Sequence, residues 1–253
     1  MKAATSIILL AFVAAVAPTS LAQPLDSSIR QLIVCITPRW DSPHASLRCF
    51  EKGDGGWSSA SRSLPALVGR NGLAWGRGIL PGKQSSRQKT EGDRCSPAGI
   101  FAVGRIFGYA RFMPPGADFP YRQVSAADAW IDDPRHPQYN QHVVIDPLHP
   151  PEWFEQQRMR LGDPAYRWLI EIRHNATPVV AGAGSAIFMH IRRGKNRPTA
   201  GCTALAEDDI EWIVRWLREE KKPHVVALPR EEYQRLWSAW GLPAPESTGA
   251  FSD

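Results

Sequence analysis

The chain alternates short apolar segments with glycine, proline and polar turns over most of its length. Residues 30–37 (RQLIVCIT) are rich in β-branched side chains, and residues 45–51 follow the turn sequence Asp41-Ser42-Pro43, which predicts a β-hairpin. Further strands are predicted at 99–110, bent at Gly104 or Gly108, and at 142–146, 167–173, 185–191 and 224–229. Glycine-rich residues 53–82 predict turns threaded by short strands.

The hydrophobic period changes after residue 205. Ile210, Ile213, Val214 and Leu217 recur at helical spacing, so residues 206–222 are predicted to form an amphipathic helix with acids in its first turn and lysines in its last. Shorter helices are predicted at 151–161 and 230–240. We therefore expect one mainly β, glycine-rich domain over residues 23–229 with a few peripheral α-helices, then a C-terminal helix and a tail over 230–253 whose last dozen residues fray.

The amino terminus has the pattern of a secretory signal peptide. Lys2 precedes an apolar run from Ile7 to Ala17, and Ser20-Leu21-Ala22 is an A-x-A-like end, so cleavage is expected after Ala22. An uncleaved anchor is the alternative, but the run is shorter than the roughly 20 residues of a membrane span. Export makes an anionic cell wall or membrane surface a better partner for the net charge of +5 than nucleic acid, which we do not expect.

The four cysteines are Cys35, Cys49, Cys95 and Cys202. In an exported protein they are able to form two disulfides in three connectivities. If Cys202 stays a free thiol, the other three form at most one bridge, and a cross-strand Cys35–Cys49 bridge is one possibility.

His190 and Cys202 are the candidates for chemistry. His190 ends an apolar strand, a basic loop follows, and Cys202 comes directly after Gly201. An imidazole, cations and backbone amides all favour the thiolate that a cysteine nucleophile needs, and Gly201 leaves room for a carbonyl to reach an oxyanion hole formed by the amides of Gly201 and Cys202. Taken singly, each residue is more often a satisfied core histidine or an inert thiol. A zinc site with Cys95 and His174 lacks paired ligand spacing, so we expect no metal and no cofactor.

Two blocks resemble the L,D-transpeptidases, the YkuD-type family of cell-wall enzymes. HIRRGKNRPTAGCTAL, from residue 190 to 205, is similar to a signature in which an upstream histidine is followed by a Ser/Thr-x-Gly-Cys element. KTEGDRCSPAGIF, from 89 to 101, is similar to an acidic-glycine turn that leads into a Thr/Ser-Pro-x-Gly-x-Phe strand. The strand pair at 166–191 and the insert at 130–143 also fit, so the resemblance runs from about Leu32 to Pro229. Many members carry a second histidine where this chain has Ala200.

The resemblance implies a β-sandwich catalytic fold, a periplasmic location in a Gram-negative bacterium, and acyl transfer on peptidoglycan stem peptides. Cys202 would form a thioester with release of terminal D-Ala, His190 would act as base, and the Ile191 carbonyl would orient the imidazole. The candidates for substrate binding are Arg192, Arg197, Thr199, Ser185 and Asp93. Asp132 and Asp133 are further candidates for meeting an acceptor amine. A cell-wall carboxypeptidase or amidase, and a non-catalytic wall-binding protein, are the alternatives.

Overall fold

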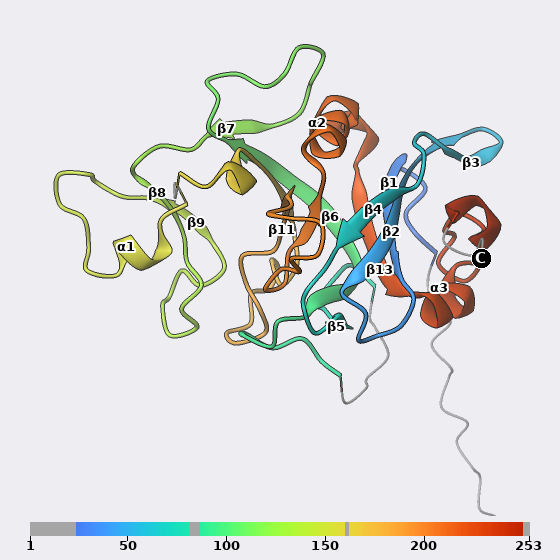
Figure 1. The fold of residues 1–253 in the computed structure, drawn as a ribbon, viewed down its shortest axis with the longest axis horizontal. Coiled ribbons are helices and arrows are strands. Elements are labelled where there is room, and N and C mark those ends of the chain that lie inside the picture. The colour runs from blue at the N-terminus through green and yellow to red at the C-terminus, as the bar shows by residue number, and fades with distance from the viewer. Residues whose placement is uncertain (1–23, 81–86, 160–161, 250–253) are drawn as a thin grey trace, which may run out of the picture.

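Eight β-strands follow one another around a closed ring in a computed structural model of the chain, which describes residues 24–80, 87–159 and 162–249 (Figure 1). In ring order they are β1 (Gln31–Thr37), β13 (His224–Pro229), β6 (Ser96–Gly108), β10 (Trp168–Ile172), β11 (Phe188–Ile191), β12 (Thr203–Leu205), β4 (Leu64–Leu67) and β2 (His44–Gly53), which pairs back with β1. The pairs β1–β13 and β11–β12 are parallel. The mainly β prediction is confirmed, in the form of one mixed, barrel-like sheet.

Five more strands complete the β-structure. β3 (Gly56–Ser59), β5 (Leu73–Trp75) and β7 (Tyr121–Gln123) pair with members of the ring, whereas β8 (Asp128–Trp130) and β9 (His142–Val144) form a separate two-stranded sheet. β8 and β9 lie beside the barrel together with the short helix α1 (Phe154–Gln157), at the left of Figure 1. The predicted signal peptide falls outside the described residues. Among the described residues, no helix has the length and apolar character needed to cross a membrane.

The predicted hairpin at the start of the domain is β1 paired with β2. All seven residues of β1 are buried, because the strand has neighbours on both edges and is covered on both faces. The register sets Cys35 opposite Leu47, and Cys49 opposite Ile33, so the two thiols do not face each other. All four cysteines are free.

The amphipathic helix is confirmed as α2 (Glu207–Trp216), but it ends before the predicted Lys222. Leu217 leaves the helical conformation, and η2 (Glu219–Lys221) is a separate 3₁₀ turn. The fully buried Gln31 of β1 donates to the Trp216 carbonyl at 2.9 Å and accepts from the Arg218 amide at 2.9 Å. A side chain distant in sequence therefore caps this helix.

The carboxyl-terminal segment packs on the barrel as far as Gly249, although it was expected to fray. α3 (Arg230–Leu236) is followed by the 3₁₀ turn η3 (Pro245–Thr248). The Tyr233 hydroxyl donates to the Pro243 carbonyl at 2.8 Å, and Arg48 of β2 donates to the Ser247 carbonyl at 2.7 Å. These bonds and the burial of Leu242 hold the segment in place.

Two hydrophobic clusters lie on the opposite faces of β10, β11 and β12. Ile170, Met189 and Leu205 belong to the main core inside the barrel. Their neighbours Leu169 and Phe188 face outward into a smaller cluster that also contacts Cys202. Since successive side chains of a strand alternate between faces, the outer face carries the candidate chemistry.

Candidate active site

The pairing of two parallel strands brings His190 and Cys202 onto one face of the sheet. β11 and β12 pair Met189 with Thr203 and His190 with Ala204, so Cys202 precedes β12 at the level of Phe188. Paired residues of neighbouring strands point to the same side, and side chains alternate along each strand. Cys202 and His190 thus share the outer face, although a twelve-residue step in sequence separates them.

The His190 side chain is held with one ring nitrogen available. Its Nδ1 lies 2.9 Å from the Ile191 carbonyl oxygen, the contact expected of Ile191. A carbonyl only accepts, so Nδ1–H donates and, in the neutral ring, the lone pair of Nε2 is left to accept a proton. Burial lowers the pKa of His190, opposed by the bond to Ile191, and the charge of Arg193 lowers it further. The imidazole is therefore a neutral base at neutral pH.

The Cys202 thiol is half-buried and donates to the Ala186 carbonyl, with an Sγ to O distance of 3.5 Å. Burial raises the pKa of Cys202 to about 11, against the opposing effects of a bond from the Phe188 backbone and the charges of Arg193 and Lys89. The resting site thus contains a protonated thiol and a neutral imidazole, which makes proton transfer part of any attack by sulfur.

Two hydroxyls fix the backbone at Cys202. The Cys202 carbonyl accepts from Thr199 Oγ1 at 2.6 Å and from Ser96 Oγ at 3.0 Å. Thr199 Oγ1 also accepts from the Gly201 amide at 3.1 Å, and Ser96 Oγ from the Gly69 amide at 2.9 Å. The hydroxyl of Thr199, a candidate for substrate binding, is thus hydrogen-bonded to the backbone of Gly201 and Cys202. Within the described chain the Cys202 amide has no acceptor, so it is the better oxyanion donor of the two candidate amides.

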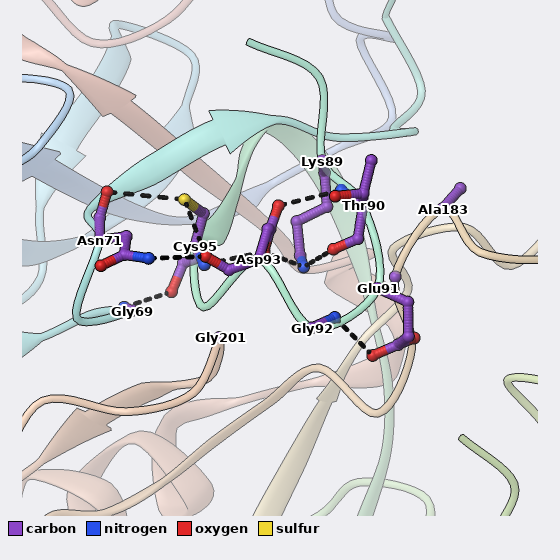
Figure 2. Close-up of polar contacts among 12 residues, drawn as sticks. Gly69, Asn71, Lys89, Thr90, Glu91, Gly92, Asp93, Cys95, Ala183 and Gly201 are labelled. Atoms are coloured by element: carbon purple, nitrogen blue, oxygen red, sulfur yellow. Dashed lines mark hydrogen bonds and ion pairs between the residues drawn. The ribbon is translucent and has the colours of Figure 1, made fainter. Parts of the chain in front are cut away.

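The acidic-glycine turn packs against Gly201, as Figure 2 shows. The Asp93 carboxylate accepts from buried Lys89 Nζ at 2.6 Å and from the amides of Thr90 and Cys95, both at 2.9 Å. A β-carbon at Gly201 would lie 3.2 Å from the Cys95 carbonyl oxygen, so the turn and the cysteine loop touch. Both carboxylate oxygens of Asp93 consequently hold this turn.

Ser185 belongs to a polar cluster with Glu91 of the acidic-glycine turn and Tyr139. Its hydroxyl donates to Glu91 Oε2 at 2.7 Å, and the Tyr139 hydroxyl donates to the same oxygen. Tyr139 in turn accepts from the Gly184 amide at 3.1 Å. The cluster ties the acidic-glycine turn to the segment that enters β11, so Ser185 has a structural contact in addition to any role with substrate.

Asn140 joins Trp130 of the β8–β9 sheet to the amide of Ala186, the residue whose carbonyl accepts from the Cys202 thiol. Its Oδ1 accepts from the Ala186 amide and from Trp130 Nε1, both at 3.1 Å. Its Nδ2 donates to the carbonyls of His174 and Asn175, both at 2.9 Å. Asn140 is buried, and its φ of 56° is one that asparagine tolerates better than most residues. Its sequence signal, an asparagine within the insert, does not reveal these four bonds.

Arg193 belongs to the basic loop and was not among the candidates for substrate binding, but it contacts the ring that packs on His190. Its guanidinium lies 4.8 Å from the Tyr166 ring centre, and its Nε lies 2.6 Å from Asp163 Oδ2. Tyr166 packs edge-on against His190 with ring centres 5.4 Å apart. Arg192 is half-buried and Arg197 exposed, and neither side chain has a hydrogen-bond partner in the described part of the chain. Both stay candidates for substrate carboxylates.

A cavity of about 190 Å³ opens onto Cys202. It is lined by residues from the outer face of the barrel and from the segment that carries β8, β9 and α1: Trp130, Asp132, Gln156, Gln157, Arg158, Met159, Tyr166, Leu169, Ala186, Phe188 and Cys202. Asp132 is therefore the acidic candidate that lines the same cavity as the thiol, whereas Asp133 pairs with Arg135 at 2.8 Å. Across residues 24–80, 87–159 and 162–249, no group of three or more His, Cys, Asp or Glu side chains is arranged to hold a metal.

Comparison with known proteins identifies the family. No curated protein matches the sequence. A crystal structure of the helical cell shape determining protein Pgp2 from Campylobacter jejuni matches with a TM-score of 0.40 and 14% identity, over 83% of this chain and 51% of that one. This chain thus spans about half the length of that structure. The model of the YkuD L,D-transpeptidase catalytic domain matches residues 44–226. Most of the sequence is covered, and the chain belongs to the YkuD family of L,D-transpeptidase catalytic domains.

Proposed function

We propose that the protein is an exported cysteine transpeptidase that cross-links or trims peptidoglycan stem peptides in the periplasm. The observation that carries the proposal is the placement of Cys202 and His190 on one outer face, beside a cavity, with Nε2 of His190 open. A thiol and a base arranged in this way suit acyl transfer through a thioester.

In the proposed first half-reaction, Cys202 Sγ attacks the carbonyl of a diaminopimelate residue whose carboxyl side is joined to terminal D-Ala. His190 Nε2 takes the thiol proton, the C–S bond forms, and the oxyanion is received by the Cys202 amide. The C–N bond then breaks, and the imidazolium returns the proton to the leaving D-Ala amine. The products are a thioester on Cys202 and free D-Ala.

In the second half-reaction, an amine of another stem peptide attacks the thioester. The new C–N bond forms as the C–S bond breaks, and the amine proton passes through His190 to the departing sulfur. Water in place of the amine gives a trimmed tripeptide instead of a cross-link. The burial that keeps thiol and imidazole neutral favours this proton-coupled route over a resting thiolate.

The test is intact-mass spectrometry after incubation with a carbapenem or with a disaccharide tetrapeptide that ends in D-Ala. We expect a covalent adduct on the wild type and on Cys95→Ala, a matched control that removes a different free thiol. We expect none on Cys202→Ala and a strongly slowed one on His190→Ala.

Product analysis distinguishes the two outcomes of the thioester. Dimeric muropeptide establishes transfer to an amine, whereas tripeptide alone assigns the protein to the carboxypeptidases. An adduct that persists in Cys202→Ala, or full turnover of His190→Ala, contradicts the mechanism.

A further inference from the structure

A larger cavity, of about 780 Å³, lies on the same outer face as the catalytic pair. It is bordered by Arg105 and Phe107 of β6, by Glu171 of β10 and the following Arg173, and by Trp130 and His142 of the β8–β9 sheet. β10 pairs Leu169 with Phe107 on one side and with His190 on the other, and Glu171 with Phe188. The register therefore sets the cavity, the histidine and the thiol along one surface of the barrel.

Aromatic side chains lie between the larger cavity, called the groove from here on, and the cavity at Cys202. Trp130 lines both spaces. Its ring centre lies 6.0 Å from that of Phe107, which lines the groove, and 4.9 Å from that of Phe188, which lines the cysteine cavity. Trp130 is itself held by Asn140. A ligand in the groove thus ends against the same ring that a ligand on Cys202 touches.

Two arginines and a glutamate from β6 and from the end of β10 border this groove. Glu171 Oε2 accepts from the Arg105 amide at 3.0 Å, which turns the carboxylate across β6. Gly104 permits this, because a β-carbon there would lie 2.2 Å from Glu171 Oε2. Arg105 and Arg173 are exposed, and their guanidinium groups have no hydrogen-bond or ion-pair partner among the described residues. Two unpaired guanidinium groups beside a carboxylate complement a ligand that carries both carboxylates and an ammonium group.

We propose that this groove binds the acyl acceptor: a second peptide with free carboxylates and a primary amine on an aliphatic stem. The inference rests on the proposed function. The arginines bind the carboxylates, and the aliphatic stem crosses Phe107 and Trp130 toward the thioester. Glu171 holds the ammonium group in the waiting peptide. As it leaves Glu171 for the thioester, the ammonium group gives one proton to solvent. The neutral amine then forms the C–N bond as the C–S bond breaks, and His190 carries the second amine proton to the departing sulfur.

The test measures the two half-reactions separately. Thioester formation from the disaccharide tetrapeptide is followed by intact mass, and its partition to dimer or tripeptide is followed with increasing disaccharide tripeptide as acceptor. For Arg173→Ala and Glu171→Gln we expect unchanged thioester formation and an acceptor KM raised about tenfold, the loss of one charge-assisted contact. Arg173→Lys should recover part of the loss. Arg39→Ala, an exposed arginine on the loop after β1, serves as the matched control and should equal the wild type.

Direct binding separates this inference from the proposed chemistry. Calorimetric titration of the disaccharide tripeptide into Cys202→Ser protein, which cannot form the thioester, should show binding that Arg173→Ala weakens. That result supports the groove even if the wild type forms no thioester, an outcome that would refute the proposed function alone. Normal thioester formation with unchanged acceptor KM and unchanged binding in Arg173→Ala and Glu171→Gln overturns the groove assignment.

Discussion

Replacing Thr199 with valine isolates the hydroxyl that bonds the Cys202 backbone. Valine keeps the shape of threonine but removes the donor to the Cys202 carbonyl and the acceptor for the Gly201 amide. The carbonyl retains Ser96, whereas the Gly201 amide is left without an acceptor. One lost hydrogen bond and one orphaned buried donor cost about 2 kcal/mol together. For a domain of this size, we expect the thermal midpoint to fall by about 4–8 °C.

The kinetic effect of Thr199→Val should exceed the effect on stability. A displacement of the cysteine backbone by about 1 Å slows reactions by roughly 100-fold. We therefore expect thioester formation with a carbapenem to slow by about 10- to 100-fold at a temperature at which the variant is fully folded. Thr199→Ser keeps the hydroxyl and should stay within about threefold of the wild type.

Stopped-flow acylation and calorimetric unfolding of Thr199→Val, Thr199→Ser and Ser96→Ala provide the measurement. The Thr199→Val/Ser96→Ala double variant leaves the Cys202 carbonyl without either hydroxyl, so its loss should exceed the sum of the single losses. Wild-type acylation by Thr199→Val, or equal rates for the valine and serine variants, refutes the idea that this hydroxyl positions the nucleophile.

Three further predictions concern buried ionisable groups. Burial lowers the pKa of His174 to about 4, so between pH 6.5 and pH 4 the unfolded chain binds a proton that the folded chain does not. The free energy of unfolding therefore falls by about 3 kcal/mol as the pH falls through this window. In urea unfolding, His174→Gln should lose less stability over this window than the exposed control His149→Gln. Asp93→Asn leaves buried Lys89 without its carboxylate partner and should lower the free energy of unfolding in urea by about 3 kcal/mol. The surface substitution Asp133→Asn should hardly change the urea midpoint, and equal effects of the two substitutions contradict the pairing of Asp93 with Lys89. Because the pKa of Cys202 is raised to about 11, its iodoacetamide alkylation rate should still rise above pH 9, and a plateau between pH 7 and 8 would show a preformed thiolate instead.

Local sequence patterns predicted the elements whose burial follows from their own residues. The β-branched run of β1 and the helical spacing of Ile210, Ile213 and Val214 both specified the element that formed. The end of the helix α2 could not be predicted, because its cap is the side chain of Gln31 on the distant strand β1. The packed carboxyl-terminal segment depends likewise on Arg48, far away in sequence.

The candidate site divides in the same way. The resemblance located His190, Gly201 and Cys202, and the register of β11 and β12 gives them a common face. Arg193 and Asn140 were predicted only as parts of a basic loop and of an insert, because the side chains that they contact lie on other segments. Thr199 and Asp93 were predicted to bind substrate, which stays a prediction. Their hydrogen bonds to backbone amides and to Lys89 give them a structural position that no spacing rule supplies.

The ring of strands is joined unevenly, and its weakest joint adjoins the thiol. β12 pairs with β4 only at Ala204 and Leu67, whereas β1 and β13 share a continuous ladder from Leu32 to Thr37. Local opening requires less free energy where fewer backbone bonds must break together. The ladder itself therefore holds β12 to β4 weakly, and the backbone bonds of Thr199 with Val68 and Arg70, both at 3.0 Å, add the hold on the cysteine loop. The position of the Cys202 backbone in the ring of strands is thus set by the loop that precedes β12 more than by the β12–β4 ladder.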